Sequence, residues 1–262
     1  MHCKVSRFDL RIAKLAHRLR PTDDSLRGIR VSLDGVERRF HVRSRSEGDL
    51  GAFHQIFVNR DYSIEMFRRH ADIHRKYNAI IASGKAPLIL DGGANIGASV
   101  VWFAAAYPHS HVIAIEPEQG NCELLKKNCH GLDYSLIRGG LGAREGTLFV
   151  QDPGISDWGF RLGASGDYAV PVVCARDLVE KAAADDRRVP FIAKIDIEGG
   201  EQELFSERVE WVGRFPVVII ELHDWLFPRE ARSRTFIKAI SSLNVDVVYR
   251  NENLFCFNND LL

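Results

Sequence analysis

The chain begins with a stretch whose apolar side chains recur every three or four residues. Over residues 4–19 this period predicts an amphipathic helix, which ends before Pro21 because proline interrupts helical hydrogen bonding. Apolar and polar residues alternate over 29–43 around Asp34-Gly35, a dipeptide that favours tight hairpin turns. We therefore assign residues 1–80 to an N-terminal cap, formed by a basic amphipathic helix and a β-hairpin.

From Pro87 onward, short apolar runs alternate with helical stretches, which is typical of βαβ units in a parallel sheet. We assign residues 81–262 to this second, α/β domain. The expected strands are 88–91, 111–115, 134–138, 191–196 and 216–222, and the expected helices lie near 96–106, 118–129, 176–184, 201–212 and 231–242. Added strands are expected at 147–150 and 168–174, and a terminal hairpin at 245–249 and 254–257.

The charge of the chain is balanced in total but uneven along its length. Basic and acidic side chains number 35 each, so the overall balance does not indicate a nucleic-acid partner. Residues 1–45 nevertheless hold twelve basic and five acidic side chains. We expect the basic helix over 4–19 to pack on the acidic remainder of the chain, because amphipathic helices usually cover their own core. Peripheral contact with a membrane surface is the alternative.

The cysteine pattern bears on the compartment in which the protein works. Five cysteines are scattered without metal-ligand spacing, which fits reduced thiols. No apolar run approaches the roughly 20 residues of a membrane span, and the first twenty residues lack the apolar block of a secretory signal. We expect a cytoplasmic protein, with peripheral attachment at the inner membrane face as the alternative. The sequence predicts no oligomeric state.

A glycine-rich loop directly follows the first predicted strand of the α/β domain, in the sequence Asp91-Gly-Gly-Ala-Asn-Ile-Gly97. Missing side chains at Gly93 and Gly97 let the backbone approach a ligand, and Asn95 tolerates left-handed backbone geometry. The G-x-G-x-x-G fingerprint of dinucleotide binding is absent in this register. Asp91 instead suits a cationic group, such as the α-amino group of an amino-acid-bearing cofactor.

The next predicted strand ends in Glu116-Pro117. An acidic residue at the end of the second strand is suited to accept two hydrogen bonds from a ribose diol. Two ligand-binding features at successive strand ends are more specific than one glycine-rich loop alone. The residues therefore predict a site for a nucleoside-bearing cofactor at this edge of the sheet.

These motifs resemble the FkbM family of S-adenosylmethionine-dependent methyltransferases. The resemblance covers about residues 85–225 and implies a class I methyltransferase fold, a Rossmann-like, mainly parallel, seven-stranded sheet with a reversed last strand. It also implies methylation of a hydroxyl oxygen. The resemblance rests on the loop 91–97, Glu116-Pro117, Lys194-Ile-Asp-Ile-Glu-Gly-Gly-Glu201 and Ile219-Ile-Glu-Leu-His223. By this resemblance Asp91, Gly93, Ala94, Asn95 and Gly97 would hold the methionine end of S-adenosylmethionine, Glu116 with Pro117 the ribose, and Gly140 and Leu141 would lie near the adenine.

Charged residues cluster at the ends of two later strands and are the candidates for catalysis. Lys194, Asp196 and Glu198 project together if the extended backbone persists to residue 198, and Glu221 and His223 form a second such pair. Asp196 and His223 lead as the groups that orient or deprotonate a hydroxyl, since histidine titrates near neutral pH. Glu198 could instead bind the substrate, and Lys194 could instead form a buried ion pair.

A metal ion is a further possibility for the same strand ends. Asp196, Glu198, Glu221 and His223 offer the oxygen and nitrogen atoms that divalent cations use. Carboxylates also gather at strand ends without any metal, so we expect no required metal ion.

Three functions from different classes remain open at this point. The first is an O-methyltransferase that acts on a hydroxyl of a glycan, glycolipid or secondary metabolite. The second is an NAD(P)-dependent oxidoreductase, which Asp91 and the absent fingerprint disfavour. The third is a non-catalytic module that binds a membrane or partner through its basic helix. Candidates for the wall of an acceptor site are Trp158, Trp225 and Phe227. Candidates for a lid over the cofactor are His54, Asn59, Tyr62 and Glu65.

Overall fold

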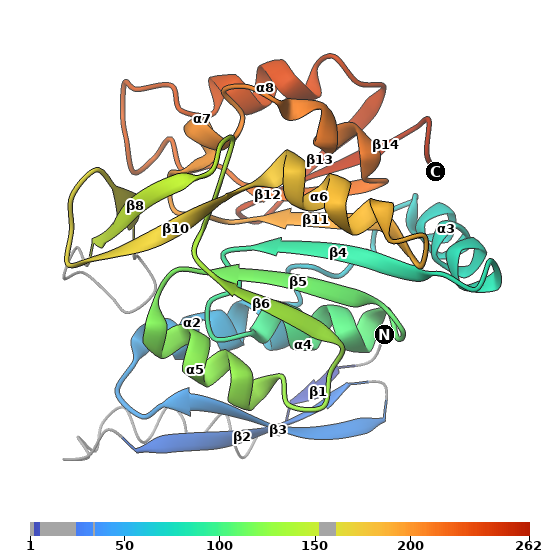
Figure 1. Cartoon of the computed structure of the whole chain (residues 1–262). Coiled ribbons are helices and arrows are strands. Elements are labelled where there is room, and N and C mark those ends of the chain that lie inside the picture. The colour runs from blue at the N-terminus through green and yellow to red at the C-terminus, as the bar shows by residue number, and fades with distance from the viewer. Residues whose placement is uncertain (1–2, 6–24, 34, 152–160) are drawn as a thin grey trace.

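A computed structural model describes residues 3–5, 25–33, 35–151 and 161–262 of the chain. Its centre is a seven-stranded sheet in the order β13-β14-β12-β11-β4-β5-β6 (Figure 1). The strands are β4 (Ala86–Gly92), β5 (His111–Glu116), β6 (Tyr134–Arg138), β11 (Arg188–Ile195), β12 (Val217–Glu221), β13 (Val245–Arg250) and β14 (Asn253–Asn258). Because β14 runs antiparallel to both neighbours while the other core pairs are parallel, the predicted mainly parallel sheet with a reversed last strand is confirmed.

The position of β4 at the centre of the sheet explains why its sequence is almost continuously apolar. It lies between β11 and β5, and successive side chains point to opposite faces of the sheet. Leu88 and Leu90 pack into one buried cluster, whereas Ile89 packs into the other. Both faces of β4 are therefore covered, and its carboxyl end opens into the glycine-rich loop.

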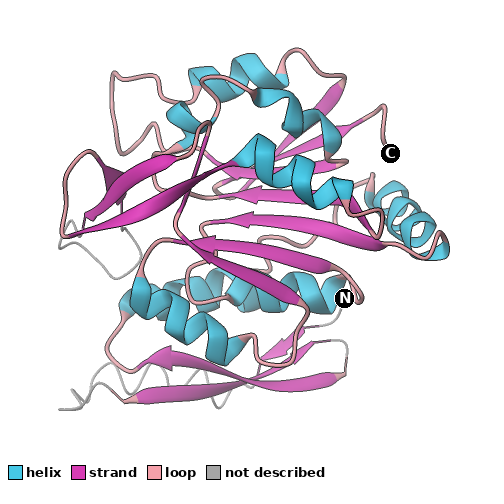
Figure 2. Cartoon of the chain, in the orientation of Figure 1, coloured by secondary structure: helices cyan, strands magenta, loops and turns pink. Residues whose placement is uncertain are grey.

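Helices cover the two faces of this sheet (Figure 2). One cluster packs α3 (His70–Ala82), α4 (Ala98–Ala106) and α5 (Gln119–Asn128), and the other packs α6 (Ala175–Ala184), α7 (Glu201–Leu204), the 3-10 helix η2 (Val209–Arg214) and α8 (Arg234–Ile240). The single helix predicted over 201–212 is wrong, because Arg208 adopts a left-handed φ of 54° and separates α7 from η2. The helix α3 was not predicted.

The cap contains the predicted hairpin, formed by β2 (Leu26–Leu33) and β3 (Val36–Arg43). A short strand β1 (Cys3–Val5) pairs antiparallel with β2, so the helix predicted over 4–19 does not begin at Lys4. Pairing satisfies backbone groups along the edge of β2, and this long-range interaction outweighs the local helical period. The remainder of the predicted helix lies outside the described residues.

A second added sheet lies between β6 and α6 in the sequence. Its order is β7-β10-β8-β9, and the expected strands at 147–150 and 168–174 are both part of it. Its strands are β7 (Gly140–Gly142), β8 (Gly146–Gln151), β9 (Arg161–Gly163) and β10 (Tyr168–Cys174). The sheet begins directly after β6, so its first residues lie at the carboxyl edge of the central sheet.

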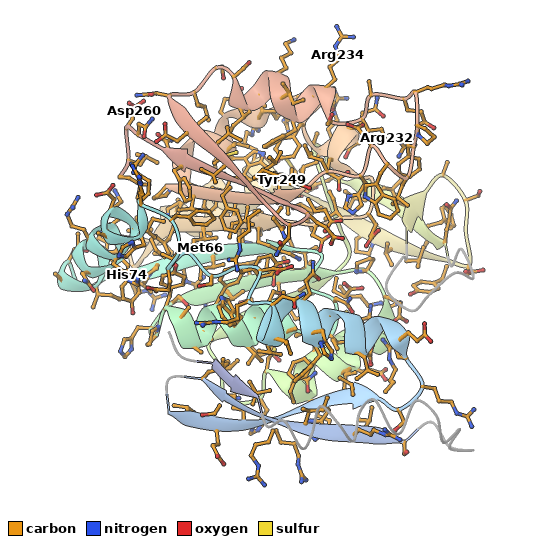
Figure 3. The ribbon with its side chains drawn as sticks, turned by 180° about the vertical axis from the view of Figure 1, so that it is seen from behind. Met66, His74, Arg232, Arg234, Tyr249 and Asp260 are labelled. Atoms are coloured by element: carbon orange, nitrogen blue, oxygen red, sulfur yellow. The ribbon has the colours of Figure 1, made fainter. Side chains whose placement is uncertain are left out.

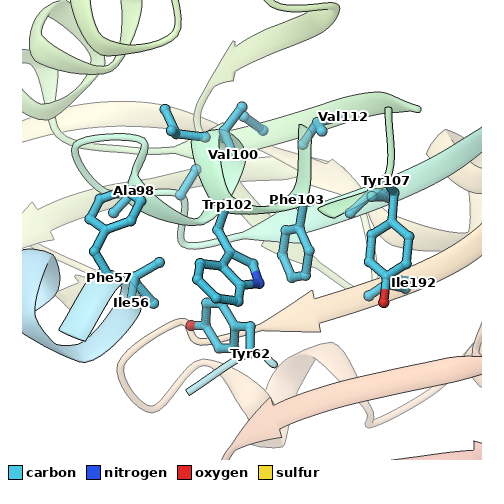
Figure 4. Packing of buried hydrophobic residues seen from close by; sticks show 14 of the residues in the cluster. Ile56, Phe57, Tyr62, Ala98, Val100, Trp102, Phe103, Tyr107, Val112 and Ile192 are labelled. Atoms are coloured by element: carbon cyan, nitrogen blue, oxygen red, sulfur yellow. The ribbon is translucent and has the colours of Figure 1, made fainter. Parts of the chain in front are cut away.

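The segment after the hairpin packs tightly on α4. It contains α2 (Glu47–Phe53) and the π-helix η1 (His54–Val58), neither of which was predicted. Tyr62 stacks on Phe103 with ring centroids 5.4 Å apart, and Figure 4 shows this pair beside Trp102 and Phe57. The aromatic packing fixes the segment that leads from η1 toward α3.

None of the helices in the described part of the chain combines the length and apolar character that crossing a membrane requires.

Asn128 joins the hairpin to the α/β core. Its Oδ1 accepts from His41 N at 2.7 Å, and its Nδ2 donates to His41 O at 3.0 Å and to Ile96 O at 2.9 Å. We expect Asn128→Ala to lower the free energy of unfolding by about 2–3 kcal/mol, because buried backbone groups lose their partners. Urea unfolding measures this, with the exposed neighbour Lys127→Ala as control. Equal urea midpoints for the two variants would contradict this role.

Candidate active site

A cavity of about 290 Å³ opens at the carboxyl ends of β4, β5 and β11, and we call it the smaller cavity. This is the edge at which parallel α/β sheets bind ligands. Most of its lining comes from loops after strands, not from the strands themselves. The lining residues are Gly93, Asn95, Ile115, Glu116, Pro117, Asn121, Gly139, Gly140, Leu141, Leu148, Asp196, Ile197, Glu198, Gly199, Gly200, Gln202, Glu203 and Arg232.

The glycine-rich loop is held against two neighbouring strands. The backbone N–H groups of Gly93 and Ala94 both donate to Ile115 O at 3.0 Å. Gly93 has a φ of +77°, and a Cβ atom there would lie 1.7 Å from the carbonyl oxygen of Asp196. Asn95 adopts a left-handed φ of 47°, as its residue type predicts. Gly93 and Asn95 both line the smaller cavity.

Asp91 has a different partner from the one that the sequence predicts. The residue is fully buried and does not line the smaller cavity. Its Oδ2 accepts from Ser99 Oγ at 2.6 Å, and its Oδ1 lies 3.2 Å from Lys194 Nζ. The side chain of Asp91 therefore points toward Lys194 on the adjacent strand β11 and not into the smaller cavity. In this position it stabilises the start of the glycine-rich loop.

Lys194 forms a buried ion pair with Asp91, which the sequence offered as the alternative to a catalytic role for this lysine. Its Nζ donates to Gly93 O at 2.6 Å and lies 3.7 Å from Asp196 Oδ2. Burial alone would lower the lysine pKa, but Asp91, Tyr62 and Asp196 outweigh that effect and hold it above its ordinary value. The ammonium group thus ties β11 to the loop after β4 and stays charged.

Two other residues predicted to hold the cofactor lie within the loop but outside the cavity lining. Ala94 is buried, and Gly97 is the N-cap residue of α4, with a φ of +87°. A Cβ atom on Gly97 would lie 2.7 Å from Cys129 Sγ, so glycine permits the close approach of α4 and α5. Neither residue lines the smaller cavity.

Glu116 closes the next side of the smaller cavity. Its Oε2 accepts from Asn95 N at 2.9 Å, and its Oε1 accepts from Glu118 N at 2.9 Å and from Asn121 Nδ2 at 3.2 Å. Burial raises the pKa of this carboxyl group to about 7, although these hydrogen bonds favour the charged form. Pro117 lies beside it in the lining.

The remaining wall of the smaller cavity is largely apolar. Leu141 and Leu148 come from the added sheet, and Ile115 and Ile197 from the ends of central segments. Gly140 and Leu141 are thus placed in the cavity that Glu116 and Asn95 also line. A flat aromatic ring would find apolar contacts here.

Some lining residues were not predicted to belong to the site. Arg232, labelled in Figure 3, lies just before α8, donates to Gly199 O at 3.1 Å and covers the Phe227 ring at 3.4 Å. Gln202 and Glu203 belong to α7. Gln202 and Glu203 directly follow the Gly199-Gly200 turn, whereas no sequence signal marks Arg232, because only the folding of the chain after β12 brings it to the site.

His223 lies at the centre of four carboxyl groups. Its Nδ1 is 2.9 Å from Glu201 Oε1, and its Nε2 is 3.5 Å from Glu221 Oε1 and 3.7 Å from both Asp196 Oδ1 and Glu198 Oε2. Burial alone would lower the histidine pKa, but the Glu201 hydrogen bond and the surrounding carboxylates raise it to about 9. His223 is therefore an imidazolium at neutral pH.

The extended backbone does not persist to residue 198. The strand β11 ends at Ile195, and Glu198 adopts a left-handed φ of 53°. The condition under which strand alternation would bring Lys194, Asp196 and Glu198 together is therefore not met. A turn, not an extended strand, brings Glu198 beside Asp196.

Three of the described residues are close enough together that they could hold a metal ion. Asp196, Glu221 and His223 each offer one ligand atom, and these atoms lie within 4.8 Å of one another. Oxygen and nitrogen ligands of this kind suit a divalent cation. Burial and the neighbouring Asp196 raise the pKa of Glu221 to about 8.

A larger cavity of about 880 Å³ adjoins the smaller one. The two share Asn95, Asp196 and Glu198 in their linings. Met66, labelled in Figure 3, lies on the segment before α3 and lines the larger cavity. The full lining is Gly51, Ala52, His54, Gln55, Asn59, Asp61, Met66, Asn95, Asp196, Glu198, Glu221, Arg250, Asn251 and Glu252.

Only some of the residues considered for an acceptor site or lid reach these cavities. His54 and Asn59 line the larger cavity, whereas Tyr62 is buried against Phe103. Trp225 is 68% exposed and lines neither cavity, and Trp158 lies outside the described residues. Glu65 pairs with His74 at 3.2 Å.

Comparison with known proteins identifies the family. The family model of the methyltransferase FkbM domain matches residues 91–246. The chain belongs to the FkbM methyltransferase family. The FkbM chain is accordingly an S-adenosylmethionine-dependent methyltransferase, and the oxidoreductase alternative is excluded.

The relatives of this FkbM chain are distant. A hexuronic acid methyltransferase of Haloferax volcanii, AglP, is 22% identical over 169 residues, which cover 63% of this chain and 68% of the relative. Among solved structures, an O-methyltransferase of Bacillus cereus in complex with SAH has a TM-score of 0.42 at 9% identity, covering 79% of this chain and 89% of that one. An O-methyltransferase structure from Klebsiella pneumoniae has a TM-score of 0.42 at 11% identity, with coverage of 79% and 90%.

The backbone contact at Gly93 gives the first test of the FkbM site. We expect Gly93→Ala to abolish measurable binding of S-adenosylhomocysteine, because the added Cβ atom would collide with the Asp196 carbonyl. Calorimetry measures the binding, and urea unfolding monitors the fold. Gly84→Ala is the control, since Gly84 also has a positive φ of 76° but open space around it. Equal binding by the two variants would contradict the crowding argument.

The pKa of Glu116 allows the expected contact between this residue and the ribose of the cofactor to be tested by varying the pH. Ribose hydroxyls donate to a carboxylate, and a pKa of about 7 means that the ionised fraction of Glu116 rises roughly tenfold between pH 6 and 8. We therefore expect the affinity for S-adenosylhomocysteine to rise about tenfold over this range. Calorimetry at several pH values should show a flat profile for Glu116→Gln. A rise of the same size in that variant would assign the effect to another group.

Proposed function

We propose that this methyltransferase transfers the methyl group of S-adenosylmethionine to a hydroxyl oxygen of a glycan, glycolipid or secondary metabolite. The observation that carries the proposal is the junction between the two cavities. Asp196, Glu198 and Asn95 line both of them, so a cofactor in one and an acceptor in the other would meet at these residues. Such a shared wall favours transfer by positioning two ligands against each other.

The smaller cavity suits the cofactor. Gly93 and Asn95 both line it, and the Oδ1 atom of Asn95 is buried without a hydrogen-bond partner among the described residues. Glu116 would hold the ribose, and Leu141 and Leu148 would contact the adenine. When bound, S-adenosylmethionine supplies a methyl group whose bond to sulfur breaks, with its electron pair passing to sulfur, as the acceptor oxygen bonds to the methyl carbon.

Asp196 is the residue proposed to act on the acceptor hydroxyl. Its side chain is 22% exposed, and its two oxygens lie 3.7 Å from Lys194 Nζ and from His223 Nε2 respectively. These two cations hold the carboxylate in place, and it would orient the hydroxyl and take its proton as the oxygen–methyl bond forms. Lys194 and His223 would act as positioning residues.

His223 is not the proposed base. A pKa of about 9 leaves its imidazolium protonated at neutral pH, so it has no free nitrogen to accept a proton. Its hydrogen bond with Glu201 fixes the ring, whose Nε2 lies 3.7 Å from Asp196 Oδ1. Glu198 would contact the acceptor from the other side of the junction.

The name of the relative AglP supports a carbohydrate-type acceptor, because that protein is a hexuronic acid methyltransferase. The cytoplasmic location and the membrane contact through residues 4–19 stay predictions, as most of that segment lies outside the described residues.

The proposal is tested at Asp196. We expect Asp196→Asn to lower kcat about 10²–10⁴-fold, as for loss of a general base, while the affinity for S-adenosylhomocysteine changes by less than about threefold. Methyl transfer is followed with labelled donor, and binding by calorimetry. Asp186→Asn, an exposed aspartate near the other end of β11, is the control. A kcat equal to that of the control would remove Asp196 from the mechanism.

A further inference from the structure

The larger cavity is bounded by segments from opposite ends of the chain. One wall comes from α2, η1 and the residues that follow them, and the other from the turn between β13 and β14. Asp196, Glu198 and Glu221 lie at the edge shared with the central sheet. Nothing in the family match assigns a ligand to this cavity, because its first wall precedes residue 91.

Acidic residues outnumber basic residues in the lining of the larger cavity. Five of its residues carry carboxyl groups, and Arg250 is the only arginine or lysine among the lining residues in the described part of the chain. The carboxyl residues are Asp61, Asp196, Glu198, Glu221 and Glu252. A negatively charged acceptor would therefore meet repulsion from the ionised carboxylates, and Glu221 would contribute least because its pKa is raised to about 8.

Arg250 is already engaged in a structural role. Its guanidinium donates to the backbone carbonyls of Ser63 at 2.7 Å, Asn59 at 3.3 Å and Asp61 at 3.4 Å. An acceptor carboxylate would have to break these bonds to recruit it. The cationic groups nearest the junction, Lys194 and His223, are likewise paired with protein carboxylates.

The hydrogen bonds of Arg250 also hold the two walls of the larger cavity together. Arg250 ties the loop 59–63 to the terminal hairpin, and Asn251 Nδ2 donates to Asp61 Oδ1 at 2.7 Å. Tyr62, in the middle of this loop, stacks on Phe103 of α4. The cavity therefore does not depend on a bound acceptor to bring its two walls together.

Amide groups and the imidazole of His54 supply the remaining polar lining. Gln55, Asn59, Asn95 and Asn251 present amide groups, and Asn95 Oδ1 is a buried acceptor without a partner. Amides and carboxylates together suit a ligand that presents many hydroxyl groups.

We propose that the larger cavity selects a polyhydroxylated, sugar-like acceptor that is neutral or carries an amine, and that it rejects acceptors with a carboxylate. The inference rests on the proposed function, because it describes the acceptor of that reaction. It also separates this chain from the relative AglP, whose name specifies a hexuronic acid.

Three glycosides that differ only at carbon 6 test the charge preference. They are methyl glucoside, methyl 6-amino-6-deoxyglucoside and methyl glucuronide, with hydroxymethyl, ammonium and carboxylate groups at that position. Calorimetry on the full chain saturated with S-adenosylhomocysteine measures their binding. We expect the first two to bind and the glucuronide to bind at least about tenfold more weakly, because of charge repulsion.

A charge reversal at the rim tests the cause of that preference. Glu252→Lys should shift the ratio of glucoside to glucuronide affinity toward the glucuronide by about three- to tenfold, an effect that added salt reduces. Glu210→Lys is the matched control, because Glu210 is exposed on η2 and lines neither cavity. An unchanged ratio in Glu252→Lys would overturn the electrostatic argument.

Other outcomes also overturn the inference. These are glucuronide binding equal to or tighter than glucoside binding, and the absence of binding by all three glycosides. Glucuronide binding that requires added Mg²⁺ and is lost in EDTA would instead indicate a cation at Asp196, Glu221 and His223 that recruits an anionic acceptor. If the expected order holds but mass spectrometry detects no methyl transfer to any glycoside, the charge inference stands and the proposed function fails.

Discussion

The site depends on the close backbone approach between the loop after β4 and the end of β11. A side chain on Gly93 would lie 1.7 Å from the Asp196 carbonyl, so the two segments touch through backbone alone. Asp196 N donates to Gly92 O at 3.0 Å, and Lys194 Nζ donates to Gly93 O. This contact places the glycine-rich loop and the proposed catalytic carboxylate side by side before any ligand is bound.

Buried charges keep that arrangement in place. Lys194 faces Asp91 across adjacent strands, and His223 faces Glu201 and the junction carboxylates. Removing one member of such a pair leaves an uncompensated buried charge, which costs more than the pair itself contributes. The two cations therefore hold Asp196 at the boundary of the two cavities. Both cations are thus already paired with carboxylates of the protein, which leaves little attraction for an anionic acceptor.

Much of the architecture follows from the sequence. The strands of the α/β domain, the hairpin over 29–43 and the loop at 91–97 are visible as local periods and turn residues, and the order of these units is typical of a class I methyltransferase fold. The helices α2 and α3 escaped prediction because mixed polar and apolar residues there pack through long-range aromatic contacts, such as Phe53 with Phe40 and Tyr77 with Phe191. Arg232 and Arg250 have no signature, since long-range folding alone brings them to the cavities.

The sequence by itself determined which backbone geometries are possible. Gly93, Asn95 and Gly97 permit the left-handed turn, and the acidic residues mark the strand ends. Tertiary structure decided which charges are paired and which face a ligand. Asp91 turns to Lys194 and Glu116 faces the smaller cavity, although each lies at or beside the end of a parallel strand. The reason is physical: a turn depends on the residues that form it, whereas the environment of a carboxylate depends on whatever side chain another strand places opposite it.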